Sequence, residues 1–433
     1  MKLRSDLRQP EASNILAVWS NVFSQLASLK YIGHRQPKST QLRAKSTQPF
    51  DLSQPQVPAR IVFVANSDWY LYNFRASLIR QTENAGWQVT LVCTDGPYIQ
   101  NLRDRGWRVI ALPLESAGAN PLREAKALAK LARTLHEERP TIVHLFTLKC
   151  VLYGCLAAPF VSGAKFIGAL TGMGYLFTTT TLKTRVLRQV VLRGLSLGFK
   201  QAKAELIFQN EADRQEFVNA QMIPKHRTHV IRGSGVDCDK FHPDNRIASP
   251  DGELRILFCG RLIVEKGIRE YLAAIAELRA QGYTFESQIA GAPYPGNPSS
   301  LSDAEVAELA NDPNHSYLGH HDDMRSLFAQ SDIVVLPTYR EGTPKALLEA
   351  AASGCIIVTT DIPGCHGIVE TGYNGHLVPS GQVGPLIHAL EDLLKIDANR
   401  RYAMRQRSRE IAVERFSDQH VNSSTLALYN NAP

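Results

Sequence analysis

The sequence predicts an α/β protein with two Rossmann-like domains, whose parallel sheets face each other across a cleft. The chain has 433 residues, which is too many for one ordinary hydrophobic core. Its 44% hydrophobic and 21% charged residues are typical of a folded globular protein. Short β-branched runs alternate with helical stretches in two series along the chain, and this alternation is the pattern of parallel sheets with crossover helices.

The first series predicts an N-terminal domain of residues 59–235. Residues 36–58 before it are rich in Gln, Ser, Thr, Lys and Pro without periodicity, so we expect residues 1–58 to form a flexible extension. Within the domain, strands are expected at Ile61–Ala65, Gln88–Cys93, Arg108–Pro113 and Ile142–Leu145, and helices at Phe74–Ala85, Tyr98–Arg105 and Pro121–Glu138.

The second series predicts a C-terminal domain of residues 236–415. A hinge at Val230–Pro243 precedes it, and residues 416–433 are expected to pack back on the N-terminal domain. Ligands of open α/β sheets bind beyond the carboxyl ends of the strands, so the site is expected in the cleft between the domains. Strands are expected from Leu254 to Gly260 and at Phe285–Ala290, Ile333–Pro337, Cys355–Thr359 and His376–Val378, with a helix at Ile268–Gln281.

The net charge of +7 and the pI near 9.0 suit an anionic partner, because a positive field raises the local concentration of anions. A nucleotide sugar, an anionic phospholipid surface and a nucleic acid are all negatively charged and would all suit. The basic residues are dispersed and no nucleic-acid-binding motif appears, so no nucleic-acid partner is expected.

The seven cysteines are scattered, with no C-x-x-C pair and no Cys/His cluster at metal spacing. We therefore expect a reducing compartment and no structural zinc. The N-terminal region is charged from its second residue and has no continuous apolar stretch of the length of a signal peptide or a membrane span. These features predict a cytoplasmic protein.

The segment Arg340–Glu349 (R-E-G-T-P-K-A-L-L-E) is the centre of the predicted chemistry. Gly342 and Pro344 are expected to open a helix, which puts Glu341 at its entrance and Glu349 two turns further in. The free N–H groups of a helix N-terminus suit a diphosphate, and glycine lets a ligand approach the backbone closely. The alternative is a helix whose glutamates only cap and solvate it.

A second segment carries two cations at a strand-to-helix turn. Arg261 directly follows Gly260 at the end of a predicted strand, and Lys266 comes five positions later, before Gly267. Two fixed cations can hold one diphosphate and stabilise the negative charge that builds up as it departs. The alternative is a solvated charged turn.

These motifs resemble those of the retaining glycosyltransferases of family 4, which have the GT-B fold. The chain is especially similar to the bacterial capsule, O-antigen and protein N-glycan enzymes that extend undecaprenyl-diphosphate-linked sugars. The resemblance runs from about Ala59 to the C-terminus. The motifs that match in order and spacing are Gly260–Arg261 with Lys266–Gly267, Glu341 with Glu349, Asp361–Gly364 and Gly372–Gly375.

The resemblance implies transfer of a hexose or N-acetylhexosamine from a UDP-sugar to a lipid-linked saccharide acceptor, in surface polysaccharide or glycan biosynthesis. No metal cofactor is expected, because two cations and a helix N-terminus can neutralise the diphosphate. Asp322 and Asp323 are predicted to cap the helix that follows them instead of binding a metal. A sugar-nucleotide epimerase and a catalytically silent nucleotide-sugar-binding subunit remain as alternative functions.

By resemblance, Arg261 and Lys266 grip the diphosphate. Glu341 lies near the donor sugar and completes the catalytic set, and Glu349 accepts hydrogen bonds from the ribose hydroxyls. The other expected donor-binding residues are Gly260, and Gly342, Thr343 and Lys345 through their backbone N–H groups.

In the N-terminal half, the stretch from His144 to Lys149 is similar to a family stretch with two histidines, the second of which is replaced by Phe146. His144 and Lys149 are therefore expected to contact the sugar or the acceptor. The alternative for His144 is a satisfied structural histidine. Gly172 and Gly174 resemble a loop that closes on donor and acceptor, and glycines suit such a mobile loop.

Residues 182–203 mix apolar positions with basic ones. A basic amphipathic helix can lie on an anionic bilayer, so one interpretation is peripheral contact with the cytoplasmic face of the inner membrane. The other interpretation is a packed Rossmann helix with a solvated basic side.

Overall fold

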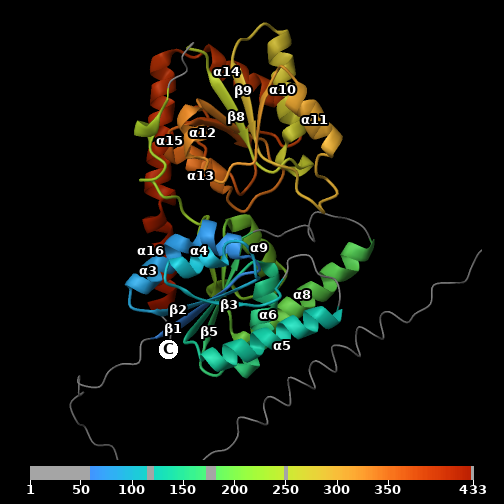
Figure 1. The fold of residues 1–433 in the computed structure, drawn as a ribbon, viewed down its shortest axis with the longest axis vertical. Coiled ribbons are helices and arrows are strands. Elements are labelled where there is room, and N and C mark those ends of the chain that lie inside the picture. Colours follow the sequence, from blue (N-terminus) through green and yellow to red (C-terminus); the bar gives the residue numbers. More distant parts are fainter. Residues whose placement is uncertain (1–58, 115–120, 172–181, 248–251, 431–433) are drawn as a thin grey trace, which may run out of the picture.

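The computed structural model describes residues 59–114, 121–171, 182–247 and 252–430. Within them the chain forms two parallel sheets covered by helices, which confirms the predicted pair of α/β domains. Figure 1 shows one domain above the other, with the N-terminal domain in blue and green and the C-terminal domain in yellow and orange.

The first sheet has seven strands in the order β3-β2-β1-β4-β5-β6-β7, and neighbouring strands pair in parallel. The four strands predicted here are present with small shifts at their ends. The strands are β1 Arg60–Val64, β2 Gln88–Cys93, β3 Arg108–Ala111, β4 Ile142–Phe146, β5 Lys165–Leu170, β6 Glu205–Phe208 and β7 Thr228–Val230.

The first helix of this domain begins earlier than the predicted Phe74. The Ser67 hydroxyl accepts a hydrogen bond from the backbone N–H of Tyr70 at 3.3 Å and starts helical structure at Asp68. The helical elements are α2 Asp68–Tyr70, the π-helix η1 Leu71–Arg75, α3 Ala76–Asn84, α4 Ile99–Asp104, α5 Pro121–Glu138, α6 Leu148–Ala157, η2 Ala158–Phe160, α8 Leu182–Ala202, α9 Glu211–Asn219 and η3 Lys225–Arg227.

The second sheet has six parallel strands in the order β10-β9-β8-β11-β12-β13. The strands are β8 Arg255–Cys259, β9 Glu286–Ala290, β10 Ser316–Gly319, β11 Ile333–Leu336, β12 Ile356–Thr360 and β13 Gly375–Val378. The helical elements are η4 Pro243–Asn245, η5 Val264–Lys266, α10 Ile268–Ala280, α11 Asp303–Asn311, α12 Arg325–Gln330, α13 Lys345–Ala352, α14 Val383–Lys395, α15 Ala398–Phe416 and α16 Asp418–Asn430.

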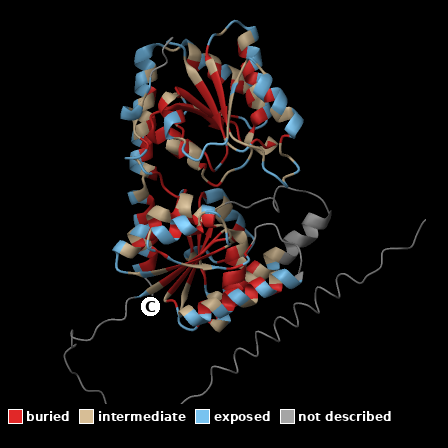
Figure 2. Cartoon of the chain, in the orientation of Figure 1, coloured by how far each residue is buried: buried red, intermediate tan, exposed pale blue. Residues whose placement is uncertain are grey.

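The two sheets form the centres of the two cores. Figure 2 shows the strands as the most buried parts of each domain. All five residues of β12 are buried, as are all five of β4. Helices cover both faces of each sheet, which explains why these strands appear in the sequence as continuous apolar runs instead of alternating patterns.

The last two helices connect the domains. Helix α15 contributes Ile411 and Phe416 to the core of the C-terminal domain. Helix α16 lies beside α3 on the N-terminal domain (Figure 1) and contributes Val421, Leu428 and Tyr429 to that domain's core. The end of the chain is therefore a structural part of the first domain.

Each sheet has a point at which the strand order reverses. This point lies between β1 and β4 in the first sheet and between β8 and β11 in the second. The loops that follow the two central strands diverge there and leave a crevice at their carboxyl ends, where ligands of such sheets bind. The residues that follow β1, β4, β8 and β11 are thus the candidates for a site.

Candidate active site

The loops after β8 and β11 meet at the reversal point of the second sheet. The backbone N–H of Tyr339 donates to the Glu265 carbonyl at 2.8 Å, and the Thr338 hydroxyl donates to the same carbonyl at 3.0 Å. This pairing of the two loops places the ammonium group of Lys266 against the carboxylate of Glu341, with which it forms an ion pair. Two residues that are 75 positions apart thus meet.

The loop after β8 depends on a glycine to make this approach. Gly267 has a φ of 76°, in the left-handed region that favours glycine. A Cβ atom at Gly267 would lie 2.1 Å from the Pro337 carbonyl oxygen, at the end of β11. Only glycine therefore lets the turn that carries Lys266 pack this closely on the neighbouring strand.

Lys266 is a poorly solvated cation. Its side chain keeps 15% of its solvent exposure. Burial, reinforced by the neighbouring Arg261 guanidinium, lowers the pKa of Lys266 to about 7. An anion bound beside it would favour the charged ammonium form again.

Arg261 lies in a different environment, although it comes from the same loop. It is exposed, and its guanidinium lies over the Tyr294 ring at 4.7 Å from the ring centroid. It forms no ion pair with any residue that the structure describes. Gly260 donates its N–H to the Ala290 carbonyl at 3.0 Å, so this N–H group is already used within the sheet.

The helix after Glu341 begins later than predicted. Helix α13 starts at Lys345, and its N-cap residue Pro344 has an extended backbone conformation with no side-chain cap hydrogen bond. Glu349 therefore lies little more than one turn inside the helix, and the prediction of two turns was wrong. Burial raises the pKa of Glu349, and its carboxylate lies 3.7 Å from the Lys345 ammonium group.

The other residues of this segment contact the facing domain. A Cβ atom at Gly342 would lie 2.1 Å from the Gln209 side-chain oxygen and 2.6 Å from the Thr171 carbonyl oxygen. The Cγ2 atom of Thr343 would be 3.1 Å from a Cβ atom at Gly233. Gly342 is thus required for this close approach of the two domains.

Lys345 reaches across the cleft with its side chain. Its ammonium group donates to the Asn73 carbonyl and lies 4.8 Å from the centroid of the Phe74 ring. Burial lowers the pKa of Lys345. The sequence predicted only a backbone role for Lys345, and this side-chain contact with the N-terminal domain was missed.

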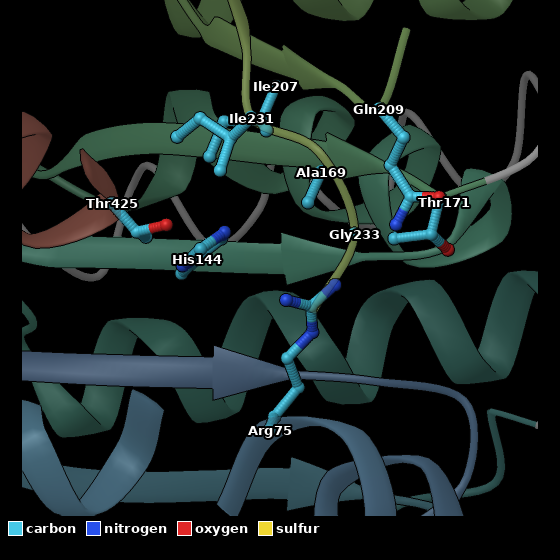
Figure 3. Close-up of a pocket in the computed structure, with 9 residues that line it drawn as sticks. All are labelled: Arg75, His144, Ala169, Thr171, Ile207, Gln209, Ile231, Gly233 and Thr425. Atoms are coloured by element: carbon cyan, nitrogen blue, oxygen red, sulfur yellow. The ribbon is translucent and has the colours of Figure 1, made fainter. Parts of the chain in front are cut away.

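His144 lies in the middle of β4 and is 1% exposed. Its Nδ1 is 2.6 Å from the Tyr429 hydroxyl of α16, and its Nε2 has no partner among the residues that the structure describes. Burial and the Arg75 guanidinium hold the pKa of His144 well below its usual range, so the ring is neutral. Figure 3 shows His144 on the wall of a pocket, opposite Gln209 and Thr171.

Lys149, the other predicted residue of this domain that the structure describes, does not line this pocket. Lys149 lies on α6, where it pairs with Glu124 of α5 at 2.7 Å and approaches the Tyr153 ring. Gly172 and Gly174 lie outside the described residues. Of the predicted pair, His144 lines the pocket and Lys149 does not.

The two acids before α12 take separate roles. Asp323 accepts a hydrogen bond from the backbone N–H of Arg325, the first residue of α12, at 3.0 Å. The N-cap position is occupied by Met324, so the prediction that these acids are the N-cap was wrong. Asp322 accepts one from the Tyr98 hydroxyl of the facing domain at 3.3 Å. Across the described ranges, no group of three or more His, Cys, Asp or Glu side chains has the arrangement of a metal site.

Arg75 is a pocket residue that the sequence did not indicate. It follows β1 on the last turn of the π-helix, and it is 6% exposed. Its guanidinium donates to the Tyr70 hydroxyl at 2.7 Å and lies over the Phe146 ring at 4.6 Å. Nothing in its spacing distinguishes it from a surface arginine, and only the packing of β1 beside β4 brings it next to His144.

Two family models match the chain, one in each domain. Residues 73–233 match the glycosyl transferase 4-like domain, and residues 253–396 match the glycosyl transferases group 1 domain.

Curated relatives match over most of their length. The chain is similar to the N,N'-diacetylbacillosaminyl-diphospho-undecaprenol alpha-1,3-N-acetylgalactosaminyltransferase of Campylobacter jejuni, with 28% identity over 327 residues. The aligned region covers 73% of this chain and 84% of the relative. It is also similar to the UDP-Gal:alpha-D-GlcNAc-diphosphoundecaprenol alpha-1,3-galactosyltransferase of Escherichia coli, with 25% identity over 330 residues. That alignment covers 71% of this chain and 80% of the relative.

Among solved structures, Anabaena HepE in complex with UDP and glucose is similar with a TM-score of 0.69, at 19% identity, over 86% of this chain and 99% of that one. This likeness confirms the GT-B fold. The two matched domains fill the two halves of that fold, and the chain belongs to the glycosyltransferases that join a glycosyl transferase 4-like domain to a glycosyl transferases group 1 domain.

Proposed function

We propose that the protein transfers a hexose or N-acetylhexosamine from a UDP-sugar to a saccharide carried on undecaprenyl diphosphate, with retention of the anomeric configuration. The names of the Campylobacter and Escherichia relatives support this acceptor, and the Escherichia name also supports a UDP-sugar donor. The solved HepE complex with UDP supports the same nucleotide.

The observation that carries the proposal is the ion pair between Lys266 and Glu341 at the reversal point of the second sheet. Arg261 lies on the same loop and has no carboxylate partner among the described residues. When a sugar bond to UDP breaks, negative charge develops on the β-phosphate. Lys266 and Arg261 would stabilise that charge more strongly than they stabilise the intact donor, which lowers the barrier.

The carboxylate of Glu341 would face the sugar once the diphosphate has taken its position beside Lys266. There it would stabilise the positive charge of an oxocarbenium-like state. The acceptor hydroxyl would attack from the face that UDP leaves and give its proton to the departing phosphate. Glu349, one turn inside α13, would hold the ribose hydroxyls.

We further propose that no divalent metal takes part, because the two cations and the first turn of α13 can neutralise the diphosphate. Activity is expected to survive an excess of EDTA. A loss of activity that only Mg²⁺ or Mn²⁺ restores would contradict this part of the proposal.

The experiment that tests the proposal is product analysis with a panel of UDP-, GDP- and ADP-sugars. A transferase releases free UDP and forms a new glycoside, an epimerase returns an altered UDP-sugar, and a silent subunit binds without turnover. Lys266→Ala and Arg261→Ala are each expected to lower turnover about 10²-fold or more. The exposed Lys395 of α14 offers a matched control as Lys395→Ala, and wild-type rates in both site variants would overturn the assignment.

Membrane contact through α8 is a separate part of the proposal. Leu195 and Phe199 are buried, whereas Arg193, Leu197 and Lys200 are exposed on the other side of the helix. None of the helices in the described ranges is long and apolar enough to cross a membrane. We expect binding to vesicles that contain anionic lipid, and a tenfold weaker affinity for Arg193→Glu with Lys200→Glu. Equal binding to neutral vesicles would contradict it.

A further inference from the structure

An exposed tryptophan lies just beyond the carboxyl end of β1, at the reversal point of the first sheet. The strand ends at Val64, and Trp69 of α2 follows five residues later. Trp69 is 42% exposed, although tryptophan side chains are highly buried on average. The loops at this end of the central strands line the crevice where ligands of such sheets bind. An accessible indole at this position is therefore a candidate for contact with a ligand.

The backbone around Trp69 is fixed by hydrogen bonds. The buried carboxylate of Asp68 accepts from the backbone N–H of Trp69 at 2.8 Å and from that of Tyr98 at 2.6 Å. A Cβ atom at Gly96 would lie 2.5 Å from this carboxylate, so a side chain there would displace it. The Trp69 carbonyl accepts from the Asn73 side chain at 3.1 Å. A rigid aromatic residue of this kind offers a large contact area at a low cost in conformational entropy.

The π-helix η1 gives the indole its neighbour. A π-helical turn is closed by an i→i+5 hydrogen bond, and such turns are frequent at functional sites. η1 begins two residues after Trp69 and brings residues five apart toward the same side. Trp69 and Phe74 are such a pair, with ring centroids 5.2 Å apart and an interplanar angle of 59°. Tyr70 and Arg75 are another, joined by the hydrogen bond from the guanidinium to the phenol oxygen.

Two contacts with the facing domain place Trp69 at the cleft. The Phe74 ring, which packs against the indole, lies 4.8 Å from the ammonium group of Lys345 at the start of α13. Tyr98, which is tied to the loop of Trp69, donates its hydroxyl to Asp322 of the C-terminal domain at 3.3 Å. Trp69 is therefore flanked by interdomain contacts and lies one ring away from the helix whose first turn is proposed to hold the donor.

The chemistry of an accessible indole in this place fits a sugar ring. One side of a pyranose presents C–H groups with a slight positive charge, and the face of an indole is negative. Stacking of the two needs no directed hydrogen bond, so it accepts sugars that differ in their hydroxyl or acetamido groups. A phosphate group does not suit the same surface, because an indole face offers a charged group no compensating partner.

We propose that Trp69 is a binding residue for the acceptor, and that the sugar ring of the acceptor stacks on its indole. This inference rests on the proposed function, since it takes the acceptor to be a saccharide. It gives the N-terminal domain a contact for the acceptor that no motif of the sequence indicated.

The test compares two ligands, one with a sugar and one without. Geranyl-diphospho-N-acetylglucosamine and geranyl diphosphate are each titrated into the full chain, with and without UDP, and binding is measured by calorimetry. We expect Trp69→Ala to bind the sugar-bearing ligand about tenfold or more weakly than the wild type and to bind geranyl diphosphate with unchanged affinity. The matched control is Tyr402→Ala, which changes another exposed aromatic residue, on α15, and should bind both ligands as the wild type does.

A second variant, Trp69→Phe, keeps a smaller aromatic face and covers the case in which Trp69→Ala does not fold. We expect it to lose part of the affinity for the sugar-bearing ligand. It also gives a spectroscopic readout that a merely structural role would not move. The sugar should shift the fluorescence of the wild type to shorter wavelength, because the indole leaves water. Trp69→Phe should bind without this shift, although Trp87 and Trp107 remain.

The other outcomes count against the proposal. An equal loss of both ligands in Trp69→Ala would assign the indole to the lipid or the diphosphate and overturn the sugar contact. Unchanged binding of both ligands would overturn it as well, as would a wild type that does not bind the sugar-bearing ligand. Failure of the proposed function is distinguishable, because it would appear as the absence of free UDP in the product analysis, whereas the two ligands report on Trp69 without a donor.

Discussion

Lys266 and Arg261 come from one loop but are held differently. Lys266 is enclosed and engaged by Glu341, whereas Arg261 is exposed and contacts Tyr294. Under the proposed function, a diphosphate bound between them would replace Glu341 as the partner of Lys266. The carboxylate that is set free remains beside the new ligand. Donor binding and the release of the Glu341 carboxylate to face the sugar would in this way be one event.

The pKa of Lys266 leads to a prediction for the pH dependence of UDP binding. In the free protein this pKa is lowered to about 7, so the side chain is mainly neutral above pH 7 and charged below it. UDP favours the charged form. We therefore expect UDP binding at pH 8 to take up a proton and to weaken as the pH rises above 7, with little change below 7.

Calorimetry at pH 8 in buffers of different ionisation enthalpy measures this proton uptake. Lys266→Arg keeps its charge at every pH and serves as the control, for which we expect a smaller uptake. Equal uptake by the two proteins would show that another group is responsible.

Glu341→Gln should separate binding from chemistry. The variant removes the anion that competes with UDP for Lys266, so UDP should bind at least as tightly as to the wild type. Turnover should fall about 10²-fold, because the charge that faces the sugar is lost. The matched control is Glu391→Gln on α14, where the carboxylate also pairs with a lysine but far from the cleft. Loss of UDP binding by Glu341→Gln would contradict this account.

At the level of elements, apolar runs were sufficient to find the central strands. β2 Gln88–Cys93 and α5 Pro121–Glu138 have the predicted bounds. The helix starts were less predictable, because they depend on local caps. Ser67 caps helical structure that starts ahead of the predicted Phe74, and α13 begins only at Lys345, after Pro344.

The sequence predicted those residues of the candidate site that belong to a recognisable motif. Lys266 and Glu341 belong to spaced patterns, and the order of the strands brings them together. The contacts of Arg75 and Lys345 arise from packing between elements that are far apart in sequence. No spacing of residues in the chain encodes that packing, so these two side chains were found only in the structure.

The two ends of α10 provide a paired test of the turn that carries Lys266. Gly267 and Gly282 both have positive φ, but a Cβ atom at Gly282 meets nothing within 4 Å. Gly282→Ala should cost about 1–2 kcal/mol in the free energy of unfolding, from backbone strain alone. Gly267→Ala should cost more, about 3 kcal/mol or above, because it also clashes with Pro337.

Urea unfolding of both variants measures the difference, and UDP affinity should fall only in Gly267→Ala. Equal losses of stability would mean that the close approach to β11 is not required.

At the level of the whole molecule, polar contacts hold the domains together across the cleft. Arg340 pairs with Asp213 of α9 at 3.3 Å, and Tyr98 donates to Asp322 at the same distance. Lys345 adds its contact with the Asn73 carbonyl. Contacts of this kind are exposed or rely on single side chains, so each is expected to contribute little to the free energy that holds the domains together.

Removal of residues 417–433 is expected to destabilise the N-terminal domain. The deletion removes Val421, Leu428 and Tyr429 from its core, at about 1.5–3 kcal/mol for each buried side chain. The sum is comparable with the whole stability of a typical domain, about 5–15 kcal/mol. We expect loss of soluble protein, whereas a control that lacks only residues 431–433 should be expressed normally. A stable, UDP-binding truncation would refute the role of α16.

The position of α16 also has a consequence for protein synthesis. Domains generally fold as they leave the ribosome, the N-terminal one first. Here the sheet of the first domain emerges early, but α16, which covers part of that domain's core, is made last. At about 5–20 residues per second, translation of the intervening domain takes roughly 10 to 40 seconds. During that time the nascent chain exposes the apolar surface that Val421 and Tyr429 will cover, so the first domain completes its core only after the second has been made.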